Sequence, residues 1–321
     1  MLFRGTKSMK VLVTGATGFL GSHLVRALVG RGDQVLVLKR SCSNLARIRD
    51  LVPALALYDA DCGGADRLLA EHDGVAAVLH LATCYGRNGE PDDVVFEANA
   101  AFPLRLLQKA ARAKVPLFVH TDTCFNTGPL RYTYLKSYSL SKRQFAAWGE
   151  HFATRGDISF VNIKLQHPYG PGDDPIKFVP ALLRQFLDNV PELRLTQGEQ
   201  QKDFVYVDDV IAALLAVVDR CGQGVAPYQE YECGYGQAVA IRDFVQTAHA
   251  LTGSRTRLLF GALPYREHEI MYSCADNAAL EDLGWSPRCG LEEGLQRTLQ
   301  ADFGFLAPSP TKAEGHASAL R

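Results

Sequence analysis

The sequence lacks several features that would assign it to a specialised class of protein. Its 34 lysines and arginines nearly balance 35 aspartates and glutamates, so the formal net charge is −1. That balance excludes the global basic field with which proteins bind nucleic acid or anionic membranes. The sequence also has no apolar run near 20 residues and no signal-peptide pattern. We therefore expect a cytoplasmic protein with neither a nucleic-acid nor a membrane partner.

Cysteines are present but are not grouped. All eight are spread singly, without a Cys-x-x-Cys pair or a regular histidine spacing. We therefore expect no metal site and no disulfide framework, and interpret the cysteines as small buried side chains or incidental thiols. The 321 residues, 47% of them hydrophobic, suffice for one large or two modest domains.

The most informative stretch is residues 11–24, where an apolar run breaks at a glycine and resumes with helical spacing. This pattern predicts a strand, a tight turn and the start of a helix. Gly15, Gly18 and Gly21 fall where a dinucleotide-binding turn needs a sharp bend, a close ligand and close helix packing. The N–H groups of the first helical turn would then point at a pyrophosphate. A glycine triplet also occurs in turns that serve packing alone.

Strand and helix patterns alternate after this turn, as in an α/β protein with a Rossmann-type doubly wound parallel sheet. We assign residues 1–165 to this NAD(P)-binding domain, with residues 1–8 as an extension. Prolines and glycines then crowd the chain, and the segments become shorter. We expect residues 166–306 to form a smaller C-terminal α/β substrate-binding region with segments that return to the first domain. Residues 307–321 are predicted to be a disordered tail.

The predicted elements of the first domain follow from this alternation. Strands are expected at 34–38, 54–58, 75–80, 116–120 and 158–165, and long helices at 94–113 and 139–154.

Tyr138 and Lys142 are four residues apart in a helical pattern, which places them on one helix face. An ammonium group beside a phenol favours the phenolate, so the pKa of Tyr138 is expected to fall towards neutrality. Thr121 ends the fifth predicted strand, at the sheet edge where ligands of such folds bind. It is well placed to hydrogen-bond a substrate oxygen, although threonine also caps loops.

The second predicted strand ends in Lys39, Arg40 and Ser41, without the acidic residue that an NAD enzyme normally presents to the ribose. Arg40 can fork onto a 2′-phosphate and Ser41 can donate a hydrogen bond to it. This pattern predicts NADPH (NADP) as the cofactor and makes NAD less favoured. The alternative is a solvated basic turn.

Seven motifs together resemble the extended short-chain dehydrogenase/reductase family of nucleotide-sugar epimerases, dehydratases and 4-ketoreductases. The resemblance extends over roughly residues 10–300. The motifs are 15–21, 80–83, Asn99, the set Thr121, Tyr138 and Lys142, 169–172, 202–209 with Lys202 where the family usually has arginine, and 266–269.

The resemblance implies three sets of site residues. The catalytic residues would be Thr121, Tyr138 and Lys142. The cofactor would contact Gly15, Thr17, Gly18, Phe19, Leu20, Gly21, Lys39, Arg40, Ser41, Asp61, Leu81, Ala82, Thr83, Asn99, Tyr138, Lys142 and Leu165. The nucleotide-sugar substrate would contact Cys84, Tyr85, Asp122, Thr123, His167, Lys177, Phe178, Lys202, Arg266 and Glu269.

A closer resemblance is to the CDP-abequose and CDP-paratose synthases. It rests on residues 80–86, 138–145, 157–161, 177–180 and 267–272. It implies NADPH-dependent reduction of the 4-keto group of a nucleotide-linked 6-deoxy or 3,6-dideoxy hexose, as in O-antigen deoxysugar biosynthesis. A CDP-sugar is favoured, although reductases of dTDP- and GDP-sugars share the layout.

Two departures from the wider family affect the predicted mechanism. Thr123 stands where the 4,6-dehydratases carry glutamate, and His167 stands where many members present asparagine to the sugar diphosphate.

Three alternative functions stay open. A 4-epimerase would retain NAD, a 3,5- or 5-epimerase would need a further acid and base from Cys84, Tyr85 or His167, and a nucleotide sensor would have no catalysis.

The family resemblance also implies a homodimer, in which helices 94–113 and 139–154 pair with their symmetry mates in a four-helix bundle. Leu104, Leu107, Phe145 and Trp148 provide more apolar surface than one buried face should need.

Overall fold

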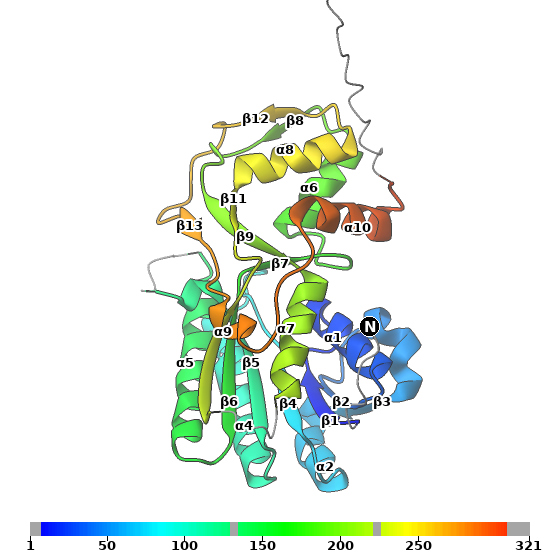
Figure 1. Ribbon diagram of the computed structural model, residues 1–321, viewed down its shortest axis with the longest axis vertical. Helices are drawn as coiled ribbons and strands as arrows, with labels where there is room; N and C mark the ends of the chain where they lie inside the picture. The colour runs from blue at the N-terminus through cyan, green and yellow to red at the C-terminus, as the bar shows by residue number, and fades with distance from the viewer. Residues whose placement is uncertain (1–7, 129–133, 221–225, 307–321) are drawn as a thin grey trace, which may run out of the picture.

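The computed structural model describes residues 8–128, 134–220 and 226–306 (Figure 1). The predicted extension, apart from Ser8, and the predicted tail lie outside the described residues, as does Cys221.

A seven-stranded parallel sheet forms the centre of the fold, with strand order β10-β6-β5-β4-β1-β2-β3. This is the predicted doubly wound α/β sheet, which is confirmed. The predicted strands agree with the observed ones to within a few residues. Hydrophobic periodicity predicts that a strand is present but does not fix the residues at which it begins and ends. The strands are β1 Lys10–Thr14, β2 Gln34–Lys39, β3 Leu55–Asp59, β4 Ala77–His80, β5 Leu117–Thr123, β6 Ser159–Leu165 and β10 Tyr228–Cys233.

Helices cover both faces of this sheet because residues alternate between two apolar cores. Val11 and Val13 of β1 face α1 (Phe19–Gly30) and α7 (Val207–Asp219). Leu12 faces the other core, to which the remaining helices contribute. These are α2 Gly64–Glu71, α4 Phe102–Arg112 and α5 Lys136–Thr154, and the short turns η1 Ala46–Ala54, η2 Ala60–Cys62 and η4 Cys124–Asn126 connect the elements.

The helix predicted at 94–113 is not one regular α-helix. It consists of α3 (Asp92–Phe96), a π-helical turn η3 (Glu97–Ala101) and α4. Pro103 lies in the first turn of α4, and its ring would clash with the carbonyl of Asn99 in a regular α-helix. The wider π turn avoids this clash and turns Asn99 inward, where it is buried.

A second region packs beyond the carboxyl ends of the main strands (Figure 1). β11, β9 and β13 form one small sheet, to which β7 is also paired, and β8 pairs with β12. α7 and β10, which follow residue 166 in sequence, return to the main sheet. The elements of this region are β7 His167–Tyr169, α6 Phe178–Leu187, β8 Glu192–Arg194, β9 Gln201–Tyr206, β11 Ala238–Ala240, α8 Ile241–Thr252, β12 Arg257–Leu259, β13 Tyr272–Ser273, α9 Ala278–Glu281 and α10 Leu291–Phe303.

The described residues contain neither a membrane-spanning helix nor a metal-binding cluster. No helix there combines the length and apolarity needed to cross a membrane. No cluster of three or more histidine, cysteine, aspartate or glutamate side chains in these ranges has the geometry to hold a metal ion.

Candidate active site

The turn between β1 and α1 has the geometry of a phosphate cradle. Gly15 adopts φ +70°, and a Cβ atom there would lie 2.5 Å from the Ala82 nitrogen. A Cβ atom at Gly21 would collide with the Gly15 carbonyl, so both positions require glycine. α1 begins without a side-chain cap and without an acidic residue in its first turn. Its N–H groups are therefore able to donate to a pyrophosphate.

Asn99 supports the loop that follows β4. Its Oδ1 accepts from the Cys84 N–H at 2.8 Å and from the Thr83 hydroxyl at 3.3 Å. Its Nδ2 donates to the Cys84 carbonyl at 2.7 Å and to the Ser141 hydroxyl at 3.1 Å. An amide has no further hydrogen-bonding capacity. Asn99 thus joins this loop to α5, and the cofactor contact predicted for it stays a prediction.

α5 places Tyr138 and Lys142 together on its buried face. The Lys142 Nζ atom donates to the Thr121 carbonyl and lies 5.7 Å from the centroid of the Tyr138 ring. Burial lowers the pKa of Lys142 to about 8, while the Asp122 carboxylate acts in the opposite direction.

The expected lowering of the Tyr138 pKa is wrong for this arrangement. Burial raises the pKa of Tyr138 well above its ordinary value, and the charges of Tyr85 and Asp122 act in the same direction. A hydrogen bond with Thr123 only partly offsets them. Tyr138 is therefore a protonated phenol at neutral pH, a form that can donate a proton.

The end of β5 presents two threonines to the site. The Thr121 hydroxyl donates to the His80 carbonyl at 3.2 Å. Thr123 follows on the same face of the strand, and its side chain interacts with Tyr138 and accepts from the Phe125 N–H at 3.4 Å. The sequence identified both residues, and the catalytic role predicted for Thr121 stays a prediction.

Aromatic and cationic side chains gather around Tyr85. Its ring lies 4.8 Å from that of Tyr138, and the Lys177 ammonium lies 5.6 Å from its centroid. Lys177 also approaches the Phe19 ring at 5.4 Å and pairs with the buried Asp173 at 2.8 Å. The second region therefore contributes a cation next to both the start of α1 and Tyr85, whose ring packs on that of Tyr138.

A cavity of about 340 Å³ opens beside this cluster and includes Tyr85 and Tyr138 in its lining. Arg87 also lines it, with its guanidinium 4.5 Å from the Tyr85 ring centroid. Sequence reasoning missed Arg87, although a basic residue two positions after Tyr85 was a visible signal. Leu135, at the cavity wall, has φ +60°, a strained conformation for leucine just before α5.

The later predicted residues converge from distant segments. The Lys202 ammonium lies 3.5 Å from the Glu269 carboxylate and donates to the Ile270 carbonyl. Arg266 lies over the Tyr134 ring at 4.0 Å. The pKa of His167 falls to about 4 because of burial and the nearby Lys202 charge, and its Nδ1 atom has no partner among the described residues. His167 is thus a neutral imidazole with one unused polar atom.

The end of β2 is less basic than the sequence predicted. Lys39 forms an ion pair with Asp59, and the Ser41 N–H and hydroxyl donate to Asp61 at 2.9 and 2.7 Å. Both acids come from the neighbouring strand β3 and the turn after it, so the motif at the end of β2 did not reveal these bonds, although Asp61 was among the predicted cofactor contacts. Within the described ranges, Arg40 is exposed and forms no ion pair.

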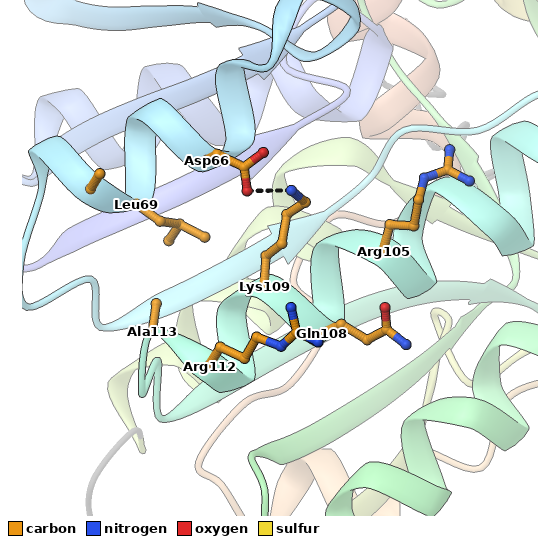
Figure 2. A pocket seen from close by; sticks show the side chains of 8 residues that line it. Asp66, Leu69, Arg105, Gln108, Lys109, Arg112 and Ala113 are labelled. Atoms are coloured by element: carbon orange, nitrogen blue, oxygen red, sulfur yellow. Dashed lines mark hydrogen bonds and ion pairs between the residues drawn. The ribbon is translucent and has the colours of Figure 1, made fainter.

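A separate groove lies between α2 and α4 (Figure 2). The figure shows Lys109 reaching Asp66 across it, with Arg105 and Arg112 on the α4 side. It shares no residue with the cavity beside Tyr138.

The fold and the glycine turn define a dinucleotide-dependent enzyme class, and comparison with known proteins identifies the family. The chain belongs to the NAD dependent epimerase/dehydratase family, which it matches over residues 11–234. The predicted family is thus confirmed.

Relatives of known type match nearly the whole chain. The CDP-abequose synthase of Salmonella typhimurium is 33% identical over 301 residues, which span 90% of this chain and 97% of the relative. The UDP-glucose 4-epimerase of Mycolicibacterium smegmatis is 28% identical, with 91% and 98% covered. The structure of MoeE5 in complex with UDP-glucose and NAD matches with a TM-score of 0.77 and 26% identity, covering 91% and 97%.

Proposed function

We propose that this protein reduces the 4-keto group of a nucleotide-linked 6-deoxy or 3,6-dideoxy hexose, with a CDP-sugar as the favoured substrate. The observation that supports reduction over dehydration is the state of the acids beside Tyr138. Dehydration needs a further acid and base around the substrate. Thr123 cannot serve as either, and both oxygens of Asp122 are bonded within the protein. The similarity to CDP-abequose synthase supports the same choice.

The proposed roles follow from the geometry. The bound reduced nicotinamide would supply the hydride. Tyr138, held as a neutral phenol, donates its proton to the oxygen of the reduced carbonyl, and Thr123 orients that phenol. Lys142 holds the nicotinamide ribose, and Thr121 lines the same edge of the sheet. The glycine turn, with Thr17 and Leu20, holds the pyrophosphate.

The substrate's anionic diphosphate would be bound by the cations of the second region. Lys177, Lys202 and Arg266 supply the positive charge, and His167 offers its unused Nδ1 atom. These residues come from four segments of the chain, so the site forms only when the second region is folded on the main sheet.

NADPH is the proposed reductant, and Arg40 is the residue that supports it. Its guanidinium is exposed at the end of β2, where it can fork onto a 2′-phosphate. The acids Asp59 and Asp61 support a second candidate function, a 4-epimerase that retains NAD, because a carboxylate near this strand end suits an unphosphorylated ribose.

The protein is also proposed to be a homodimer through α3, α4 and α5. Trp148 and Leu140 of α5 and Val94 of α3 are each more than 40% exposed. Leu107 and Phe145, which had supported the prediction, are buried in the core and contribute nothing to this surface. Light scattering of the wild type and of Trp148→Glu would test the dimer, and a monomeric wild type would contradict it.

The decisive experiment offers the purified protein a CDP-hexose and its 4-keto-6-deoxy and 4-keto-3,6-dideoxy derivatives, with dTDP analogues in parallel and with NADPH or NADH. We expect nicotinamide absorbance to fall only with a keto sugar, and magnetic resonance to identify the new hydroxyl. Isomerisation without cofactor oxidation would establish the epimerase instead. A 4-keto product from an unmodified hexose would contradict the proposal.

A further inference from the structure

Asp122 is a buried carboxylate whose two oxygens accept hydrogen bonds from other residues of the protein. Its Oδ1 atom accepts from the Thr123 N–H and from Asn126 Nδ2, both at 2.8 Å. Its Oδ2 atom accepts from Asn162 Nδ2 at 3.2 Å. Asp122 is only 3% exposed. A carboxylate held by three donors in this way is fixed in its position within the protein.

The same bonds connect Asp122 to the catalytic helix. Asn126 Nδ2 also donates to the carbonyl of Ser139 at 3.1 Å, and Ser139 directly follows Tyr138. The neighbour of Asp122 on β5, Thr121, accepts from Lys142 Nζ. The first two turns of α5 are therefore attached to the end of β5 at two points, at Ser139 through Asn126 and at Lys142 itself.

Charged and titratable groups approach Asp122 from three elements. α5 contributes Lys142 and Tyr138, and the Asp122 charge raises the pKa of both side chains. β10 contributes Tyr228, which also feels that charge, and Glu230, which shares Asn162 with Asp122. β6 contributes Lys164, whose ammonium pairs with Glu230. Of these groups, Lys142 is the cation that belongs to the proposed catalytic set.

We propose, on the basis of the proposed function, that Asp122 is a positioning residue that clamps the start of α5 onto β5 and places one negative charge behind Lys142 and Tyr138. That charge favours the ammonium form of Lys142 and the neutral phenol of Tyr138. Both are the protonated forms that ketone reduction requires. Asp122 thus acts through its neighbours and does not touch the substrate.

The test compares Asp122→Asn, which removes the charge at constant volume, with Asp66→Asn, the same change on α2 in the remote groove. Turnover of the keto sugar is measured across an alkaline pH series. Wild-type activity should decline as the pH rises through the Lys142 pKa of about 8. In Asp122→Asn this decline should move to lower pH by about one unit, and in Asp66→Asn it should not move. An unmoved decline in Asp122→Asn would overturn the proposal.

Cofactor binding distinguishes this proposal from the proposed function. Binding of the preferred reduced nicotinamide, followed by its fluorescence, should weaken with the same alkaline midpoint and the same shift, without any sugar. A wild type that binds cofactor but reduces no keto sugar would refute the proposed function. The role of Asp122 would then be tested by the alkaline midpoint of cofactor binding alone.

A second variant tests the clamp whether or not Asp122→Asn folds. Asn126→Ala breaks the connection to Ser139 and keeps the charge. It should lower turnover about tenfold through misplacement of Tyr138, without moving the alkaline decline. Unchanged turnover in Asn126→Ala would contradict the clamp.

Discussion

The glycine turn and the second region hold their functional groups in different ways. In the glycine turn, backbone atoms form the interactions that hold the turn. The Gly18 N–H donates to the carbonyl of Gly15, three residues away, at 2.9 Å. In the second region, side chains from distant segments hold one another, as Lys202 and Glu269 do. A site built from local backbone depends on residues without side chains, whereas a site built from ion pairs depends on single charged atoms. The two halves should therefore respond differently to substitution.

The largest effect is expected at Tyr138, where the two halves meet. Tyr138→Phe removes the proposed proton donor while its ring still packs on Tyr85, so turnover should fall by about 10²- to 10⁴-fold. Cofactor binding should be kept, because the glycine turn is untouched. Steady-state kinetics with a keto sugar measure the loss, and Tyr134→Phe at the cavity wall is the matched control. Turnover near that of the wild type would remove Tyr138 from the mechanism.

A smaller effect is expected in the second region, where ion pairs hold the functional groups. Lys202→Met deletes the cation and leaves the Glu269 carboxylate beside the proposed diphosphate site. The KM for the nucleotide sugar should rise about ten- to a hundredfold, the value of one hydrogen bond to a charged group. The KM for the cofactor should be unchanged. Arg257→Met, which breaks an exposed pair with Glu192 on another sheet, is the control. An unchanged KM for the nucleotide sugar would show that the Lys202 charge does not bind the substrate.

The end of β2 allows a comparison within the cofactor half. Arg40→Ala removes the exposed guanidinium and should lower kcat/KM with NADPH about tenfold, with little change for NADH. Lys39→Ala should have less effect, because the Lys39 charge is already paired with Asp59. The ratio of the two cofactor efficiencies measures the preference. Equal ratios in the wild type and in Arg40→Ala would favour the epimerase that retains NAD.

The smallest effect is expected on the pH dependence of stability. It depends on two titratable side chains in the main sheet. His80 and His120 stack at 5.7 Å in its core. Burial lowers the pKa of His80 to about 3 and that of His120 well below its ordinary value. Both groups gain protons on unfolding, so their stabilisation is present above the unfolded pKa of about 6.5 and is lost as the pH falls below it.

The measurement is the urea midpoint of unfolding at about pH 7.5 and about pH 5. His120→Phe should reduce the difference between the two midpoints, because the remaining ring of similar shape takes no proton. His151→Gln, on the outer part of α5, should leave it unchanged. An equal pH response in wild type and His120→Phe would contradict the assignment.

The sequence predicted what depends on local periodicity. The parallel sheet, the glycine turn and the shared face of Tyr138 and Lys142 all follow from spacing within one segment. The features it did not predict depend on contacts between segments. Asp59 lies opposite Lys39 only because of the register between β2 and β3. Asp61 was named as a cofactor contact, but its bonds to Ser41 were not predicted.

Side-chain orientation at the end of β5 was also not visible in the sequence. The motif named Thr121, Asp122 and Thr123 without showing which side of the strand each of them occupies. Alternation along β5 turns the two threonines to one side and Asp122 to the other, where Asn126 and Asn162 hold it. The π turn at Asn99 could have been suspected from Pro103, since proline inside a predicted helix demands an adjustment.

The position of β10 has a consequence for how the chain is made. β10 pairs with β6 in parallel, yet β7, α6, β8, β9 and α7 separate the two strands in sequence. During synthesis on the ribosome, the backbone groups along one side of β6 must wait for residues 228–233 before they find partners. A fragment that ends at residue 165 would leave this hydrophobic strand as an open sheet edge, which is a template for pairing with other chains. The fold therefore links the solubility of its first half to the completion of its second.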